Sequence, residues 1–228
     1  MELPLNPIRQ AVIQRIWRGK DPLHAFPVNL FEYDVEGWNS QHRFLEDGIV
    51  TLRPSIVVEI GVWKGASTIF MADRMRTVEL PSIVIAVDTW LGSSEHWLVD
   101  DYFGRMSFLH GYPALYHKFA SNIVRAGLAD FVVPLPIDSL NASRVLPAVG
   151  IAPTMIHLDG AHDYESVSMD LKVWWKLLTP GGLLVGDDYF VDGTWPTVRQ
   201  AFDDFFGALG IPPLEHESGK CRIRKPVS

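Results

Sequence analysis

Three carboxylates stand at the ends of two apolar runs in the second half of the sequence. Asp159 ends the run TMIHLD at residues 154–159, and Asp187 and Asp188 end the run GLLVGDD at residues 182–188. If both runs are neighbouring parallel strands, these ends meet at one edge of a sheet, where bare charges repel strongly. A divalent cation relieves the repulsion, and Mg²⁺ prefers carboxylate oxygens while keeping open positions for water or substrate. A protonated or solvated acid cluster is the alternative.

A histidine follows the first of these acids by three residues. His162 can reach the same edge and act as a general base near neutral pH, while Asp159 and a cation acidify a bound hydroxyl. The alternative is a structural hydrogen bond made by His162 at the start of a helix. Asp163 is predicted to be the N-cap of a helix at residues 164–178. The chemistry expected at this edge is removal of a proton from a hydroxyl.

A second group of residues suits a different ligand. Glu59, Gly61 and Gly65 form the motif E-x-G-x-x-x-G at the end of the apolar run at residues 55–60. Glycines allow the backbone to turn sharply and approach a ligand, and the next helix begins with unpaired N–H groups that suit a carboxylate. The spacing differs from the G-x-G-x-x-G of dinucleotide-binding loops. An ordinary strand–helix turn is the alternative.

Two more acids end strand-like runs. Asp88 ends VIAVD and can accept hydrogen bonds from both hydroxyls of a ribose, with a helix cap or a solvated strand end as the alternative. Asp138, which precedes Ser139, ends FVVPLPID and is placed to meet an adenine amino group, with an N-cap as the alternative.

The runs that carry these residues alternate with helical stretches. Short apolar runs occur at residues 55–60, 82–88, 131–138, 154–159 and 182–188. The alternation predicts a doubly wound α/β domain, in which helices cover both faces of a mostly parallel sheet.

Helices are predicted near residues 66–76, 164–178 and 197–207. The second of them places Asp170 away from its apolar face. Two weaker strands, IPPLEH and KCRIR, are expected to pair antiparallel at the sheet edge, which brings the sheet to seven strands.

Residues 89–112 interrupt this rhythm at the carboxyl end of the second strand, where open α/β sheets bind ligands. We expect the segment to be a lid over the acceptor, with a simple surface excursion as the alternative. The residues expected to contact the acceptor are Trp90, His96, Trp97, His110 and, outside the segment, Trp195.

The first 50 residues differ from residues 51–228, which carry the regular pattern. Residues 8–18 have helical spacing and are expected to pack on the domain or on the partner subunit of a homo-oligomer, with a membrane-surface helix as the alternative. Residues 19–40 are expected to be a connecting loop.

Composition narrows the class of protein. The 228 residues are 47% hydrophobic and 21% charged, as in a globular domain, and the net charge of −7 argues against nucleic acid as a partner. The single cysteine, Cys221, excludes an internal disulfide and favours the cytoplasm. The first residues lack the features of a signal peptide, and no apolar run is long enough to cross a membrane.

These motifs together resemble the class I S-adenosylmethionine-dependent methyltransferases. More narrowly, they resemble the cation-dependent O-methyltransferases that include catechol O-methyltransferase and bacterial macrolide and aminocoumarin sugar enzymes. VVEIGVWKGAST is similar to the cofactor loop of the family, VDTW to its ribose-binding segment, and LTPGGLLVGDDY to the end of its fifth strand. The similarity covers roughly residues 54–225.

The resemblance implies a role for each matching position. The implied contacts with S-adenosylmethionine are Glu59, Gly61, Gly65, Ser67, Asp88, Trp90, Asp138 and Ser139. The implied Mg²⁺ ligands are Asp159, Asp187 and Asp188. The catechol enzyme has a lysine base where this chain has His162, and the sugar enzymes tend to have an acid where it has Ala161.

The function expected from these residues is O-methylation of a small molecule such as a sugar, polyol or catechol-like diol. Two adjacent hydroxyls of such an acceptor can chelate a cation. The alternatives are a metal-independent O- or N-methyltransferase, a nicotinamide oxidoreductase, and a cofactor-binding module without catalysis.

Overall fold

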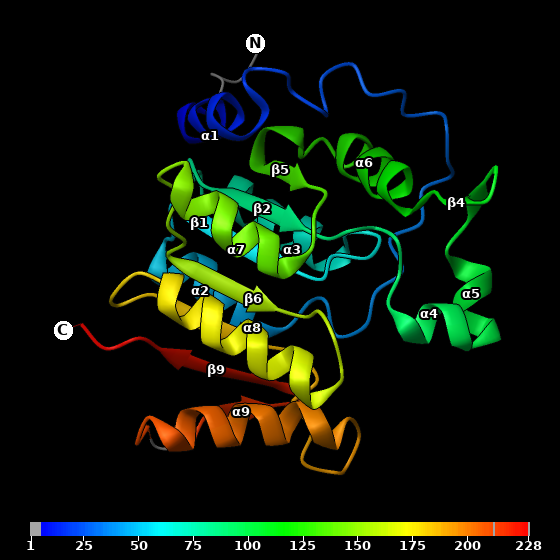
Figure 1. The fold of residues 1–228 in the computed structure, drawn as a ribbon. Coiled ribbons are helices and arrows are strands. Elements are labelled where there is room, and N and C mark those ends of the chain that lie inside the picture. The colour runs from blue at the N-terminus through cyan, green and yellow to red at the C-terminus, as the bar shows by residue number, and fades with distance from the viewer. Residues whose placement is uncertain (1–5, 212, 228) are drawn as a thin grey trace.

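The computed structural model describes residues 6–211 and 213–227. Its main sheet has seven strands in the order β5-β2-β1-β6-β7-β9-β8 (Figure 1). The five parallel strands are β1 (Ile56–Ile60), β2 (Ile83–Val87), β5 (Val132–Leu135), β6 (Met155–Leu158) and β7 (Leu183–Gly186). At the edge, β9 (Lys220–Arg224) and β8 (Glu215–Glu217) run antiparallel to their neighbours. The predicted doubly wound α/β fold is therefore confirmed.

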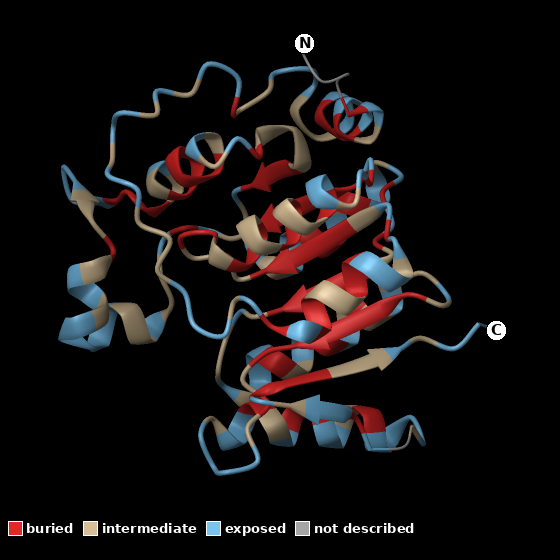
Figure 2. Cartoon of the chain, turned by 180° about the vertical axis from the view of Figure 1, so that it is seen from behind, coloured by how far each residue is buried: buried red, intermediate tan, exposed pale blue. Residues whose placement is uncertain are grey.

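Successive residues of the central strand point to opposite faces of the sheet. In β1, Val57 packs in the cluster beneath α2 (Arg43–Leu52) and α3 (Ala66–Thr77), whereas Val58 packs in the cluster beneath the helices of the other face. Figure 2 shows the strands almost entirely buried and the outer sides of the helices exposed. Helices bury both faces of the parallel strands, which explains why these strands are largely apolar runs.

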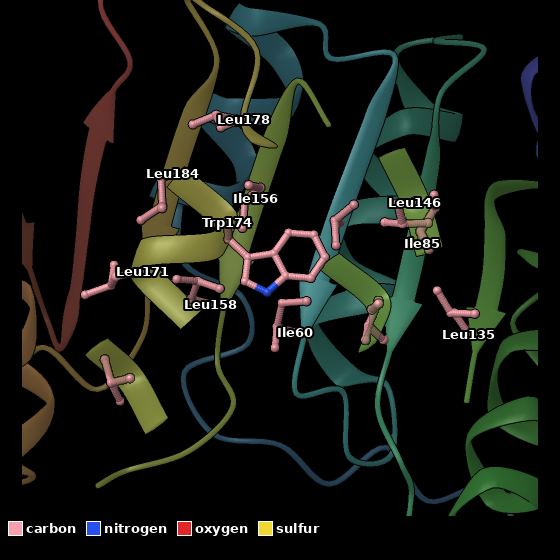
Figure 3. Close-up of a cluster of buried hydrophobic side chains, with 14 of the residues drawn as sticks. Ile60, Ile85, Leu135, Leu146, Ile156, Leu158, Leu171, Trp174, Leu178 and Leu184 are labelled. Atoms are coloured by element: carbon pink, nitrogen blue, oxygen red, sulfur yellow. The ribbon is translucent and has the colours of Figure 1, made fainter. Parts of the chain in front are cut away.

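The larger cluster packs three helices against the sheet. These helices are α7 (Ser139–Ala148), α8 (Tyr164–Leu177) and α9 (Pro196–Ala208). Trp174 of α8 lies at the centre of the cluster with Ile60, Ile156 and Leu158 around it (Figure 3). The predicted helix at residues 164–178 is confirmed, and Asp163 caps it by accepting a hydrogen bond from the Ser166 amide at 2.9 Å.

The N-terminal helix α1 (Pro7–Trp17) packs on the outer strand of the sheet. Arg9 Nε donates to the Val132 carbonyl at 3.1 Å, and Trp17 Nε1 donates to the Pro134 carbonyl at 2.9 Å. Both contacts join α1 to β5 of its own chain, as one of the two predicted alternatives requires. No helix in residues 6–211 and 213–227 is long and apolar enough to cross a membrane.

Residues 89–112 form a separate small unit beside the carboxyl edge of the sheet (Figure 1). It contains α4 (Ser94–Leu98), α5 (Asp100–Arg105), and a hairpin of β3 (Phe108–Leu109) with β4 (Tyr112–Pro113). The chain then enters α6 (Leu115–Arg125), which covers α3, and the short 3-10 turn η1 (Ala129–Phe131) leads into β5. The unit has its own fold and is not an irregular excursion.

Candidate active site

A cavity of about 820 Å³ opens at the carboxyl ends of the parallel strands. It is lined by the loops after β1, β2, β5, β6 and β7 and by residues 36–40 of the N-terminal segment. Residues 89–112, here called the inserted segment, also line it. Ligands of open α/β sheets bind at this edge. The predicted ligand residues that line it are Gly61, Ser67, Asp88, Asp138, Ser139, Asp159, His162, Asp187 and Asp188.

The two glycines of the loop after β1 differ in role. Gly61 has φ +80°, and a Cβ there would come within 1.8 Å of the Asp159 carbonyl oxygen, so only glycine fits between the two strand ends. Gly65, with φ +92°, does not line the cavity, and a Cβ there would meet the Phe119 ring at 2.8 Å. Its predicted contact with the cofactor is replaced by close packing of the loop on α6.

Glu59 lies behind the loop, fully buried and outside the cavity lining. It accepts hydrogen bonds from the hydroxyls of Ser67, at 2.5 Å, and Thr68, and it pairs with His157 Nδ1 at 3.0 Å. The predicted direct contact of Glu59 with the cofactor does not fit this position. Its carboxylate instead fixes the first turn of α3, which presents Ser67 to the cavity.

Asp88 holds the loop and faces the cavity at the same time. Its Oδ2 accepts from the amides of Val62 at 2.8 Å and Trp63 at 3.0 Å, and its Oδ1 accepts from the Trp90 amide at 2.7 Å. Carboxylate oxygens have further lone pairs for a ribose. The predicted cap and the predicted ligand contact are therefore compatible.

Trp90, predicted to contact both cofactor and acceptor, lies outside the cavity. Its backbone φ of +52° turns the ring into the core, where it is 1% exposed and packs on Phe119 with ring centroids 4.8 Å apart. Trp63, which the sequence did not single out, lines the cavity instead. The direction of the Trp90 side chain depends on its contact with Phe119 of α6, which lies outside the sequence motif around Asp88.

Asp138 and Ser139 begin α7 at the far end of the cavity. Asp138 caps the helix by accepting from the Asn141 amide at 2.9 Å, and this hydrogen bond holds the pKa of its carboxyl below the usual range. The Ser139 hydroxyl donates to Asp170 of α8 and accepts from Trp174 Nε1 at 2.8 Å.

Asp170 is a cavity residue for which the sequence predicted no role in the site. Burial raises the pKa of its carboxyl to about 6, against the opposing hydrogen bond from Ser139. Asp170 lies away from the apolar face of α8, as predicted, but the loop before α7 turns that side of the helix into the cavity wall.

The three predicted metal ligands all reach the cavity, but their carboxylates are arranged unequally. Asp159 and Asp187 come together with His157, with one candidate ligand atom of each within 4.8 Å of the others. Asp188 turns away, and its Oδ2 lies 2.9 Å from His162 Nε2. The sequence did not identify His157, because it lies within β6 and not at its end.

A buried ammonium group completes this cluster. Lys220 of β9 is fully buried, donates to Asp187 Oδ2, and lies 3.2 Å from His157 Nε2. A fully buried lysine requires such partners. The Asp159 carboxylate, in contrast, makes no side-chain hydrogen bond within the described residues, and burial, followed by the charge of Asp187, raises its pKa well above the usual range. Asp159 is therefore the open position of the cluster.

His162 is held between two carboxylates. Its Nδ1 lies 2.8 Å from Glu95 Oε2 of the inserted segment and its Nε2 faces Asp188, while Trp195 stacks on the ring at a centroid distance of 4.0 Å. Burial opposes the charge, but the hydrogen bonds with Asp188 and Glu95 outweigh it and raise the pKa of His162. In this arrangement both nitrogens carry protons, so His162 must lose one before it can act as a base.

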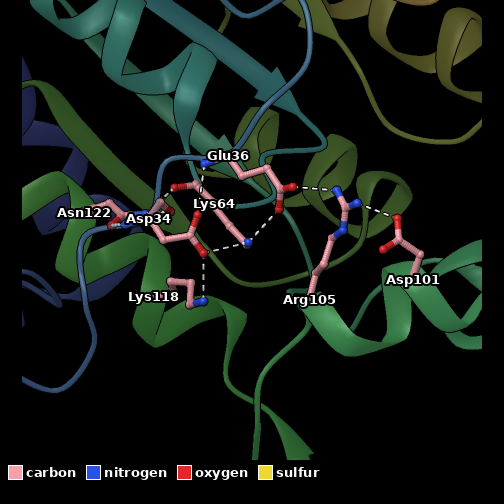
Figure 4. Close-up of polar contacts among 7 residues, drawn as sticks. All are labelled: Asp34, Glu36, Lys64, Asp101, Arg105, Lys118 and Asn122. Atoms are coloured by element: carbon pink, nitrogen blue, oxygen red, sulfur yellow. Dashed lines mark hydrogen bonds and ion pairs between the residues drawn. The ribbon is translucent and has the colours of Figure 1, made fainter.

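The N-terminal segment closes one side of the cavity (Figure 4). Lys64, buried in the loop after β1, bonds to Asp34 and Glu36 at 2.7 Å each, and Arg105 of α5 bonds to the other oxygen of Glu36. The predicted connecting loop is therefore a wall of the site. Of the expected acceptor contacts, His96 and Trp195 line the cavity, whereas Trp97 and His110 point elsewhere.

Comparison with known proteins gives a match over much of the chain. The family model described as "Methyltransferase domain" matches residues 58–189. A Streptomyces olivaceus protein named 8-demethyl-8-(2,3-dimethoxy-alpha-L-rhamnosyl)-tetracenomycin-C 4'-O-methyltransferase is 31% identical over 73% of this chain. The match spans 62% of that protein's length.

Solved structures of similar fold include three described as methyltransferases. The O-methyltransferase NovP is 20% identical and covers 81% of this chain and 77% of its own, with a TM-score of 0.61. TomG from Streptomyces achromogenes, solved with SAM, is 15% identical and covers 98% and 91%, with a TM-score of 0.60. The TDP-rhamnose 3'-O-methyltransferase CalS11 is 19% identical and covers 80% and 76%, with a TM-score of 0.56. At these identities the likeness establishes the fold.

Proposed function

The chain belongs to the methyltransferase domain family, and from this premise we propose that it transfers a methyl group from S-adenosylmethionine to a hydroxyl of a sugar-bearing small molecule. The observation that carries the proposal is the cavity, which joins the loop of Gly61 and Asp88 at one end to the acids around Asp159 at the other. A rhamnosyl group is the first acceptor to test, because the names of the S. olivaceus protein and CalS11 contain it.

The residues of the first end fit S-adenosylmethionine. Gly61 leaves room for a ligand beside the backbone, Asp88 has free lone pairs for ribose hydroxyls, and Asp138 lies where it can meet the adenine amino group. When bound, the cofactor supplies a methyl group on a sulfonium: the acceptor oxygen bonds to the methyl carbon as the carbon–sulfur bond breaks, which leaves S-adenosylhomocysteine.

The acids of the other end fit a divalent cation. The Asp159 carboxylate makes no side-chain hydrogen bond within the described residues, and Asp187 and Asp188 present further carboxylate oxygens to the same cavity. We propose that these three residues hold the cation, which would be Mg²⁺ by its preference for oxygen ligands and would supply Lewis acidity to a bound hydroxyl.

His162 is the proposed base. Asp188 and Glu95 hold its ring in the cavity that Asp159 also lines, and Trp195 fixes the ring plane. Once His162 has lost one of its two ring protons to solvent, the freed nitrogen can accept the acceptor proton. His162→Ala should lower kcat by about 10²–10⁴, the usual effect of removing a positioned base, without weakening cofactor binding.

A metal-independent methyltransferase is the second candidate, and Lys220 is the observation that favours it. Its ammonium already neutralises Asp187 and contacts His157, so part of the charge that would attract a cation is balanced within the protein. In that case Asp159, whose carboxylate makes no side-chain hydrogen bond in the described part of the chain, is the group that takes the acceptor proton.

Methyl transfer from labelled S-adenosylmethionine across a panel of glycosides, polyols and phenols tests the proposal. Activity should disappear in EDTA, return with Mg²⁺, and be lost in Asp159→Asn. Full activity in EDTA, retained in Asp188→Asn, would establish the metal-independent candidate. Absence of transfer to every acceptor, in protein that binds S-adenosylhomocysteine, would refute catalysis of this kind.

A further inference from the structure

The charge of the cavity restricts the acceptor. Carboxylates line it from end to end, from Glu36 and Glu95 at the outer wall to Asp138 and Asp170 beside α7. None of the lining residues within the described chain is a lysine or an arginine. The nearest cations of the outer wall, Lys64 and Arg105, are already paired with Glu36. A diphosphate group entering this cavity would meet these carboxylates and no lysine or arginine of the lining, since His162 is already paired with Glu95 and Asp188.

The outer part of the cavity is built for a flat apolar group. The four aromatic residues that line it contact one another in a closed ring, here called the aromatic ring: Trp38, Trp63, His96 and Tyr102. The centroid distances around it are 6.4 Å from Trp38 to Trp63, 4.5 Å from Trp63 to His96, 5.6 Å from His96 to Tyr102, and 6.2 Å from Tyr102 to Trp38. Such faces bind planar ligands and the C–H faces of sugars.

The ring residues come from three segments that the charged network of Figure 4 ties together. Glu36 bridges Lys64 of the loop after β1 and Arg105 of α5, and the Arg105 guanidinium lies 6.0 Å from the Trp38 centroid and 5.8 Å from that of Tyr102. The rings are thus held in place before a ligand arrives, which reduces the entropy cost of binding.

One donor of the aromatic ring makes no hydrogen bond within the described residues. Trp63 Nε1 is buried and has no hydrogen-bond partner in the described chain, which is uncommon for a buried polar atom. Trp38 is 53% exposed, so the ring lies at the mouth of the cavity. On the inner side, Glu95 is adjacent to His96 in α4 and bonds to His162, which places the ring directly beside the proposed site of methyl transfer.

We infer that the acceptor is an uncharged glycoside whose flat aglycone packs on the aromatic ring while its sugar reaches the acids around Asp159, and that nucleotide sugars are excluded. The inference rests on the proposed function. It also places the reaction in sequence: a glycosyl transfer that joins the sugar to its aglycone must supply this substrate, so methylation follows glycosylation.

Three forms of one sugar test the inference: methyl α-L-rhamnoside, 4-nitrophenyl α-L-rhamnoside and TDP-rhamnose. Binding is measured by saturation-transfer NMR competition in the presence of S-adenosylhomocysteine, with and without Mg²⁺, and methyl transfer is measured in parallel. The aryl glycoside should bind about 3–10-fold more tightly than the methyl glycoside, the range expected for an added aromatic contact. TDP-rhamnose should bind on the order of tenfold more weakly than the aryl glycoside. This difference in affinity should become smaller at high salt, which screens the repulsion between charges.

Trp38→Ala and Tyr102→Ala should remove the preference for the aryl glycoside and leave the affinity for S-adenosylhomocysteine unchanged. Tyr112→Ala is the matched control, because Tyr112 is an exposed aromatic residue of the same segment that does not line the cavity. Tighter binding of TDP-rhamnose, or an aryl preference that survives both ring variants, overturns the inference. Intact binding preferences without methyl transfer to any of the three would contradict the proposed function alone.

Discussion

Asp88 illustrates how one carboxylate supports a loop and a ligand together. Three backbone amides of the loops after β1 and β2 donate to it, so the turn is fixed before any ligand binds. A ribose then meets a carboxylate that is already oriented, and little side-chain entropy remains to be lost.

Asp88→Ala should weaken binding of S-adenosylhomocysteine by about 1.5–3 kcal/mol, since charge-assisted hydrogen bonds are left unmade. Isothermal titration calorimetry measures this change. Asp130→Ala, which alters an acid of η1 outside the cavity, is the control and should bind as the parent does. Tight binding of NAD and none of S-adenosylhomocysteine would contradict the assignment of the cofactor.

The buried Asp170 carboxylate lowers the stability of the folded protein at neutral pH, and Asp170→Asn should remove this loss. Its pKa is about 6 in the folded protein against an ordinary value of 3.8, so stability falls as pH rises between these two values and stays lower above them. The variant should gain up to about 1–3 kcal/mol in urea unfolding at pH 7.5 and little at pH 4. Because Asn keeps the acceptor for Ser139, an equal gain at both pH values would show that the charge is not the cause.

The inserted segment forms part of the outer wall of the cavity. Glu95 of α4 joins it to His162 on one side, and Arg105 of α5 joins it to the N-terminal segment on the other. Elsewhere the segment exposes large apolar side chains, among them Leu98 at 82%. The two charged contacts and these exposed side chains lie in α4 and α5, so we expect this part of the segment to be able to open.

Hydrogen exchange in residues 89–112 should be faster than in β1 and β2, and it should depend on pH after correction for intrinsic rates. Because Glu95 and Asp188 raise the pKa of His162, the imidazolium contact with Glu95 is complete below its ordinary value of 6.5 and is lost as pH rises through the higher folded value. Opening should therefore increase toward pH 9. In the Glu95→Gln variant the segment should open equally at pH 6.5 and at pH 9. Protection of residues 89–112 equal to that of the core strands would rule out a lid.

A series of buried, hydrogen-bonded polar side chains runs across the sheet. It runs from Asp187 through Lys220 and His157 to Glu59, and so joins β7, β9, β6 and β1 beneath the cavity. The Glu59 carboxylate extends the series by accepting a hydrogen bond from the Ser67 hydroxyl at the start of α3. This series links the acids of the acceptor end to the loop of the cofactor end, and each of its members lies within hydrogen-bonding distance of the next.

Lys220→Met should lower the free energy of unfolding by about 3–5 kcal/mol, because Asp187 is then a buried charge without its partner. Urea denaturation measures the loss. The double variant Lys220→Met with Asp187→Asn should recover most of it, since no lone charge remains. If Mg²⁺ binds at the cluster, adding it should stabilise Lys220→Met more than the parent protein. A single variant as stable as the parent would show that the ammonium is not needed.

Local patterns in the sequence were sufficient for the order of the elements and for the acids that end them. Short apolar runs predicted the five parallel strands, because a strand buried on both faces has no polar side to present. Gly61, Asp88, Asp159 and Asp187 followed from their positions after such runs, since parallel strands place their carboxyl ends together.

What each side chain does at that edge depends on neighbours distant in sequence. Lys220 belongs to a strand 33 residues beyond Asp187, and only the antiparallel pairing of β9 with β7 brings its ammonium to the acids. Trp90 packs against Phe119 of α6 in the core, and Trp63, for which the sequence predicted no role, lines the cavity instead. Burial and long-range pairing, which carry no local signature, therefore decide which acids stay open and which are already paired.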